Sequence, residues 1–275
     1  MYATVPPLQP RAVRLRILGL VAAVLLVALF VAPSFVAGNT FGGGGLAREF
    51  GDGFVEYWNL GVAEFPPRLA NAVDYWFRFH VAKAVIAGLL LVVAVVLGVR
   101  LWGSYCGGRG IGAVRRASLF VFGVAITAVA LCAGVVLMAN VQGAFAPFSS
   151  LLSVLPVNGA DGDLAVTVSE VRAQLAAGRT SPVIDVMSSD FGWYHAVMAV
   201  VAIIAAGVLL GTGVLLVRGF VRADSADRRS RRVLCAFGVL SAVLMLCAGV
   251  IALANVGTAA DPGPALVGFF DGGLL

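Results

Sequence analysis

The chain has 275 residues, of which 60% are hydrophobic and only 12% are charged, and its mean hydropathy is +0.99. A soluble domain carries about 25% charged residues, so this composition excludes a water-soluble globular protein and predicts that lipid is the solvent. The net charge of +5 does not indicate nucleic-acid binding, because the basic residues lie in short segments between apolar runs.

Five apolar runs are long enough to cross a bilayer as helices, which takes about 20 residues. In chain order they are 17–37, 81–99, 117–140, 196–217 and 233–255. We therefore predict an all-α integral membrane protein with five transmembrane helices. The first run is longer than the core of a cleaved signal peptide, and no clean cleavage site follows it, so we interpret it as an uncleaved anchor.

The spans divide the chain into seven segments. These are a cytoplasmic basic N-terminus (1–16), the first span (17–37), an outer segment (38–79), a first pair of spans (80–140), a second outer segment (141–194), a second pair of spans (195–255) and an outer C-terminal tail (256–275). The outer segments contain three stretches that we expect to be short helices, at 46–60, 66–79 and 167–178.

The distribution of charge predicts which way the spans face. With the N-terminus inside, the cytoplasmic segments hold thirteen basic and two acidic residues, whereas the outer segments hold twelve acidic residues. This excess of inner positive charge is the usual pattern in membrane proteins, and it favours N-inside, C-outside. Only one of the nineteen basic residues is a lysine, and with abundant Ala, Val and Gly this suggests a GC-rich bacterial genome and a multi-pass protein of the bacterial plasma membrane.

An internal repeat relates the two pairs of spans. Residues 131–147, LCAGVVLMANVQGAFAP, match 246–262, LCAGVIALANVGTAADP, at ten of seventeen positions, and His80 and His195 keep the same offset of 115 residues. Both pairs begin and end outside, so the copies run in the same sense. We expect a parallel tandem repeat of a helical hairpin, packed as a pseudo-two-fold four-helix bundle with the first span at its side.

Small residues recur at helical spacing in three of the spans. Helices in lipid pack closely where small residues let their backbones approach, so we assign these positions to helix packing. They are Gly123, Ala130, Gly134, Gly207, Gly211, Gly238, Ala242 and Gly249.

Polar residues gather at the predicted outer ends of the spans. This outer rim consists of His80, His195, Asn140, Asn255, Lys83, Asp74 and Asp190. We favour an interfacial belt, because polar and aromatic residues prefer this depth. Two hypotheses compete with it: a site in which the imidazoles hold a metal or a haem iron, and a polar mouth for a small ligand or a partner domain. Two histidines without close ligand spacing are a weak metal signal, so we expect no metal site and no cofactor.

No catalytic motif accompanies these features. The sequence lacks P-loop, nucleophile-elbow and zinc-protease signatures, and below Lys83 no ionisable side chain lies inside a span, which disfavours ion-driven transport. We expect a non-enzymatic accessory or scaffold subunit whose outer segments dock an envelope or membrane partner. The alternative is a small-solute facilitator or lipid-handling carrier, and a haem or quinone redox subunit is the third hypothesis.

Overall fold

The structure is a computed structural model that describes residues 10–38, 41, 44–108 and 110–273. Most of the predicted N-terminal segment therefore lies outside the described residues. Within them the chain is helical and contains no strand. The helices are α1 (Pro10–Ala37), α2 (Gly45–Leu60), α3 (Pro67–Gly107), α4 (Ala113–Phe145), α5 (Pro147–Leu152), α6 (Gly162–Ala176), α7 (Pro182–Arg222), α8 (Arg228–Ala260) and α9 (Gly263–Phe270).

Five of the described helices, α1, α3, α4, α7 and α8, are long and apolar enough to cross a membrane. Each contains one of the five predicted spans, so the prediction of an all-helical chain with five such helices is confirmed. Large apolar side chains point outward from them, including Phe30, Leu215 and Leu253, whose exposed fractions are 74%, 68% and 76%. Such a surface is stable against lipid chains, and it explains why the helices form although little of each is buried within the chain.

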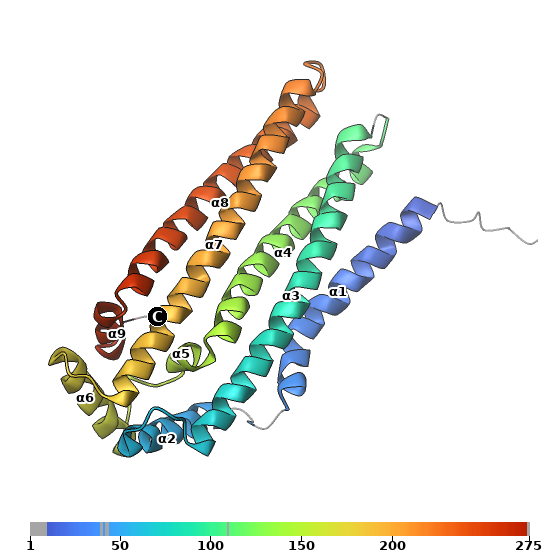
Figure 1. The fold of residues 1–275 in the computed structure, drawn as a ribbon. Coiled ribbons are helices and arrows are strands. Elements are labelled where there is room, and N and C mark those ends of the chain that lie inside the picture. Colours follow the sequence, from blue (N-terminus) through green and yellow to red (C-terminus); the bar gives the residue numbers. More distant parts are fainter. Residues whose placement is uncertain (1–9, 39–40, 42–43, 109, 274–275) are drawn as a thin grey trace, which may run out of the picture.

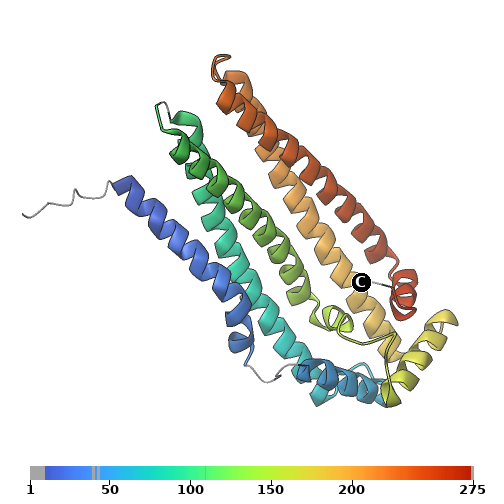
Figure 2. The same ribbon diagram turned by 180° about the vertical axis from the view of Figure 1, so that it is seen from behind.

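The five long helices stand side by side in the order α1, α3, α4, α7, α8 (Figures 1 and 2). α3 packs along α4, and α7 packs along α8, so each pair forms a hairpin. α4 lies against α7, whereas α3 and α8 contact each other much less, so the second interface expected of a closed bundle is small. α1 packs on α3 through Ala22 and Leu29, which meet Ala87 and Leu90. This contact places the first helix, whose position the sequence left open.

Both hairpin turns lie at the end of the molecule where α1 begins, and the short helices lie at the other end (Figures 1 and 2). We call these the tip end and the cap end. α3 and α7 each have 41 residues, or about 60 Å of helix, whereas the hydrocarbon core of a bilayer is about 30 Å thick. About half of each helix therefore projects beyond a membrane core.

This projection corrects the prediction of a separate short helix at 66–79. That stretch is the first third of α3, because Pro67 starts the helix and no glycine or proline interrupts it before Gly88. The stretch 46–60 does form its own helix, α2. The helix expected at 167–178 is α6, which begins five residues earlier, after Asp161, and ends before Gly178, whose φ is +61°.

We define the cap as α2, α5, α6 and α9 together with the adjoining ends of α3 and α7. It holds the largest core of the described chain, with twenty buried residues from all six helices and the segments between them. Phe54 of α2 stacks on Phe270 of α9, with ring centroids 6.4 Å apart. A Cβ at Gly53 would lie 3.0 Å from the Leu69 backbone nitrogen, so this glycine lets α2 cross α3 closely. Arg172 of α6 donates to the carbonyls of Phe270 and Val157.

Candidate functional site

The predicted rim lies where the long helices enter the cap. His80 is on α3 and Asn140 near the end of α4, so this pair belongs to the first hairpin. His195 on α7 and Asn255 near the end of α8 belong to the second. Each histidine meets the asparagine of its own hairpin, and each sits about one third of the way along its 41-residue helix.

His80 is held on both sides of its ring. Its Nδ1 lies 2.8 Å from Asn140 Oδ1, and its Nε2 lies 3.3 Å from Ser150 Oγ. Asn140 Nδ2 donates to the Val136 carbonyl at 2.7 Å, which leaves Asn140 Oδ1 as the acceptor. Trp76 Nε1 donates to Ser150 Oγ at 3.1 Å. The chain of hydrogen bonds therefore runs from Trp76 through Ser150 and His80 to Asn140.

This chain assigns the tautomer of His80. Because Asn140 Oδ1 can only accept, Nδ1 carries the proton and donates it to Asn140. Nε2 is then the acceptor, and the Ser150 hydroxyl donates to it. In the neutral form of the imidazole, both ring nitrogens therefore have a hydrogen-bond partner. Asn140, one of these partners, is buried, with only 5% of its surface exposed. The arrangement favours a neutral, structural histidine that joins α3, α4 and the cap helix α5.

His195 repeats half of this arrangement. Its Nδ1 lies 2.8 Å from Asn255 Oδ1, and Asn255 Nδ2 donates to the Ile251 carbonyl at 2.8 Å. Nδ1 therefore carries the proton here as well. Its Nε2 is buried and has no hydrogen-bond partner. The reason is visible in the sequence, since the position 115 residues after Ser150 is Ala265, which has no hydroxyl.

The charged members of the rim do not join the histidines. Asp74 forms an exposed ion pair with Arg78 at 2.8 Å, and Lys83 Nζ lies 5.3 Å from the centre of the Phe79 ring. Asp190 accepts from the backbone nitrogen and the hydroxyl of Ser149, at 2.8 and 2.6 Å. Asp190 thus ties α7 to α5, whereas Asp74 makes a local contact within α3.

Asp190 belongs to the predicted rim, but sequence patterns did not single out Gln142 and Ser149, which also link the two hairpins. Gln142 Nε2 donates to the Tyr194 carbonyl at 3.1 Å, and Trp193 Nε1 donates to the Phe145 carbonyl at 3.0 Å. With Ser149 and Asp190, they form the junction between α4, α5 and α7. Gln142 breaks the repeat, because Gly257 stands at the matching position, and this difference was the one available signal.

The electrostatics of the cap suppress ionisation of Tyr57. This side chain is fully buried among the rings of Phe65 and Phe148. Burial is the main cause that raises the pKa of Tyr57 to about 12, and the negative charges of Glu64 and Asp190 act in the same direction. The phenol is therefore neutral at any physiological pH.

The glycines assigned to helix packing differ in their surroundings. Gly123 lies against the Trp102 ring, where a Cβ would come within 2.9 Å of it. Ala130 is partly buried on the face of α4 that meets α3. Gly238 and Ala242 border a cavity of about 470 Å³ between α7 and α8. At five glycines an added Cβ would have no atom from beyond its own stretch of helix within 4 Å, and these are Gly134, Gly207, Gly211, Gly238 and Gly249. A packing role at these five positions stays a prediction.

In each hairpin, the rim contains a histidine–asparagine hydrogen bond that joins the two helices. Among the described residues, no group of three or more His, Cys, Asp or Glu side chains lies together in a way that could hold a metal ion. The nitrogen of His80 that could ligate a metal or haem iron already accepts from Ser150. Gly143 also lies close against this histidine, because a Cβ there would lie 2.7 Å from the ring.

Comparison of the chain with protein-family models, with curated proteins and with solved structures finds no match.

Proposed function

We propose that the chain is a multi-pass protein of the bacterial plasma membrane that acts as a non-enzymatic accessory or scaffold subunit. The hairpin tips face the cytoplasm, the cap faces outward, and the cap docks a protein partner of the cell envelope. The observation that carries the proposal is the cap itself, which has a larger buried core than any part of the membrane-spanning region.

A duplicated hairpin supports the proposed architecture. α3 and α7 have 41 residues each, α4 and α8 have 33 each, and every boundary is displaced by 115 residues. The two histidine–asparagine hydrogen bonds are displaced by the same number and have the same length of 2.8 Å. A repeat in one sense with both turns at the tip end agrees with the charge distribution, which favours tips inside.

The packed core of the cap supports a docking role. Six helices contribute to this core, and Trp58 Nε1 of α2 donates to Glu170 of α6 at 2.7 Å. Turns that only join spans need few residues, so a packed body of this size is more than the hairpins require. A body that is already ordered loses little conformational entropy when a partner binds.

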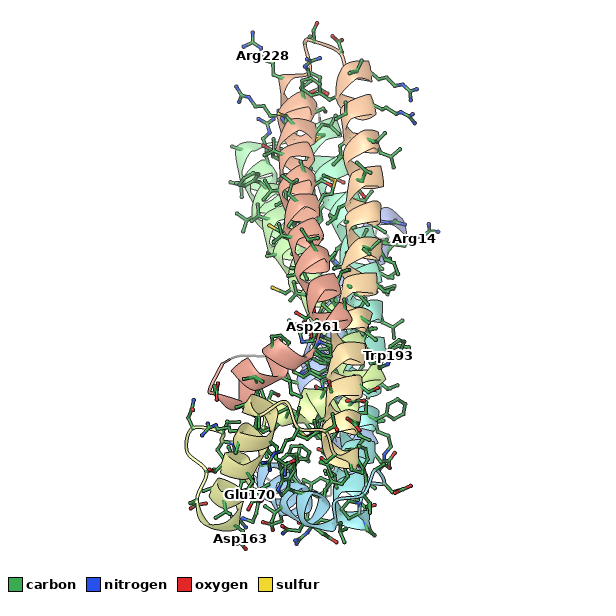
Figure 3. All side chains as sticks on the ribbon, turned by 60° about the vertical axis from the view of Figure 1, so that its left-hand side comes forward. Arg14, Asp163, Glu170, Trp193, Arg228 and Asp261 are labelled. Carbon is green, nitrogen blue, oxygen red and sulfur yellow. The ribbon has the colours of Figure 1, made fainter. Side chains whose placement is uncertain are left out.

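The cap surface indicates the chemistry of the partner. The outer segments carry twelve acidic residues and five arginines, and several of the acids lie near the end of the molecule, among them Asp163 and Glu170 (Figure 3). A cavity of about 700 Å³ lies between the α2–α3 turn and α7, lined in part by Asp185, Asp190 and the half-exposed Trp193. Carboxylates beside an aromatic ring suit a lysine or arginine, so the partner presents a basic face.

Site-specific cross-linking tests the docking proposal. A photoreactive residue at Val62, which is 43% exposed in the α2–α3 turn, is compared with one at Val121, which is 60% exposed in the first third of α4, inside the predicted span 117–140. Irradiation of intact cells is expected to give a discrete protein adduct from Val62 but only lipid adducts from Val121. Asp185→Lys should abolish the Val62 adduct by repelling a basic partner. If the protein purifies alone in mild detergent and Val62 yields no protein adduct, the scaffold proposal is wrong.

A further inference from the structure

A second feature lies at the tip end, far from the cap. A cavity of about 920 Å³ separates the two hairpin tips. Both hairpins contribute to it. Its lining includes Trp102 and Arg116 from the first hairpin, and Arg228, Arg229, Arg232 and Phe237 from the second. Arg228 marks this end in Figure 3.

The lining of this cavity is basic. Four arginines face two aspartates, and in the described part of the chain none of the four arginines forms a salt bridge. Arg116 Nη2 donates to the Ile111 carbonyl at 3.3 Å, but its Nε is buried and has no partner. A buried guanidinium nitrogen without an acceptor is costly, so this cavity is suited to an anion.

The deeper wall of the cavity is aromatic and firmly held. Trp102 Nε1 donates to Thr127 Oγ1 at 3.2 Å, and its ring meets that of Phe237 at 5.3 Å, which joins the hairpins. Arg229 donates to the Tyr105 carbonyl at 3.2 Å, with its guanidinium 5.6 Å from the centre of that ring. On α4 and α8, Phe120 and Phe237 lie on the membrane-spanning side of the arginines that line the cavity.

We propose that this cavity binds the phosphate group of an anionic phospholipid from the leaflet at the tip end. Arg116 is the central phosphate ligand, since planar guanidinium groups match phosphate oxygens in two-point contacts. Arg228, Arg229 and Arg232 supply the surrounding positive field, and Trp102 and Phe237 contact the glycerol and upper acyl chains. A basic pocket between spans at the membrane surface is where headgroups of this class bind. The lipid site is independent of the proposed docking at the cap.

A purified and delipidated protein in neutral phosphatidylcholine nanodiscs provides the test. Phosphatidylglycerol is titrated in and the bound lipid is counted by native mass spectrometry. We compare the wild type, Arg116→Gln and the matched control Arg115→Gln, whose side chain is exposed beside the cavity and does not line it. A parallel arm uses phosphatidylglycerol with bromine near the headgroup end of its chains. Trp102 is the only one of four tryptophans at the tip end, so its quenching relative to Trp102→Phe reports binding in the folded wild type.

The wild type is expected to retain one phosphatidylglycerol, and Arg116→Gln should weaken its binding about tenfold, whereas Arg115→Gln should leave it unchanged. If Arg116→Gln and Arg115→Gln weaken phosphatidylglycerol binding equally, the effect comes from general surface charge, and the proposed site is wrong. Inorganic phosphate at millimolar concentration should not displace the lipid. Displacement by phosphate would overturn the lipid assignment in favour of a free anion. Absence of Trp102 quenching in the wild type would overturn the proposal without any variant.

Discussion

The tight contact between Gly143 and His80 gives the sharpest test of the site as described. A Cβ at Gly143 would lie 2.7 Å from Cε1 and Nε2 of the His80 ring. Ordinary carbon contacts are about 3.5 Å, so Gly143→Ala must push the ring by nearly 1 Å. The ring cannot yield freely, because Asn140 and Ser150 hold it from both sides.

The expected cost follows from these contacts. Displacing the ring breaks two hydrogen bonds worth about 1 kcal/mol each, and the overpacking itself costs about 1–3 kcal/mol. Alanine in place of glycine returns about 0.5–1 kcal/mol through helix propensity. We predict a net loss of about 2–4 kcal/mol in the free energy of unfolding, measured by SDS titration in mixed micelles with far-ultraviolet circular dichroism.

Gly134 on the same helix is the matched control. A Cβ there meets nothing within 4 Å, so Gly134→Ala should be neutral or slightly stabilising. In a His80→Ala background the ring is gone, and Gly143→Ala should then cost less than about 0.5 kcal/mol. Equal effects of the two glycine substitutions, or an undiminished cost without the ring, would refute the structural role assigned to His80.

Three further predictions concern the cap and the histidine network. Tyr57→Phe should remove the last component of the alkaline absorbance titration at 295 nm, whose midpoint lies near 12. Because the fold favours the neutral phenol, ionisation of Tyr57 should leave the stability of the wild type unaffected below pH 10 and lower it between pH 10 and 12. A normal midpoint would contradict the burial of Tyr57. Phe54→Ala should destabilise by about 3–5 kcal/mol in the same SDS titration, and Val121→Ala by less than about 0.5 kcal/mol, with similar costs arguing against a cap core. Ser150→Ala should shift the ¹⁵N resonance of Nε2 in His80 and not that in His195, and a shift at both would disprove the assigned contact.

The sequence predicted the helical class and the location of the five long helices, because an apolar run of about 20 residues has few alternatives to a helix in lipid. It failed at the cap ends of those helices. Residues 66–79 are polar enough to look like a surface helix, but nothing in them breaks α3, so the helix continues into the cap. The position of α1 against α3 depends on the buried cluster that holds Leu29 and Leu90, and hydrophobic periodicity does not determine which helices share such a cluster.

The candidate site likewise has contacts that the sequence predicts and contacts that it does not. His80 and Asn140 end neighbouring spans at one level, so their proximity follows from a hairpin. The contacts with Ser150 and between Ser149 and Asp190 depend on how α5 folds back into the cap. The offset of 115 residues aligned His80 with His195, and once the Ser150 contact is known it also accounts for the unpartnered Nε2 of His195, because Ala265 stands at the position that matches Ser150. The cavity around Arg116 also arises from long-range packing. In the sequence, its arginines indicated only which ends of the spans face the cytoplasm.

The most direct test of the proposed arrangement is labelling of single cysteines in intact cells with a membrane-impermeant maleimide. In a cysteine-free background, Thr180→Cys reports on the cap, and Ala113→Cys and Ser225→Cys report on the two hairpin tips; all three positions are exposed. We predict that Thr180→Cys is labelled in intact cells and that both tip variants are labelled only after the membrane is permeabilised. Labelling of either tip in intact cells, or protection of the cap, would contradict two like-oriented hairpins beneath an outward-facing cap.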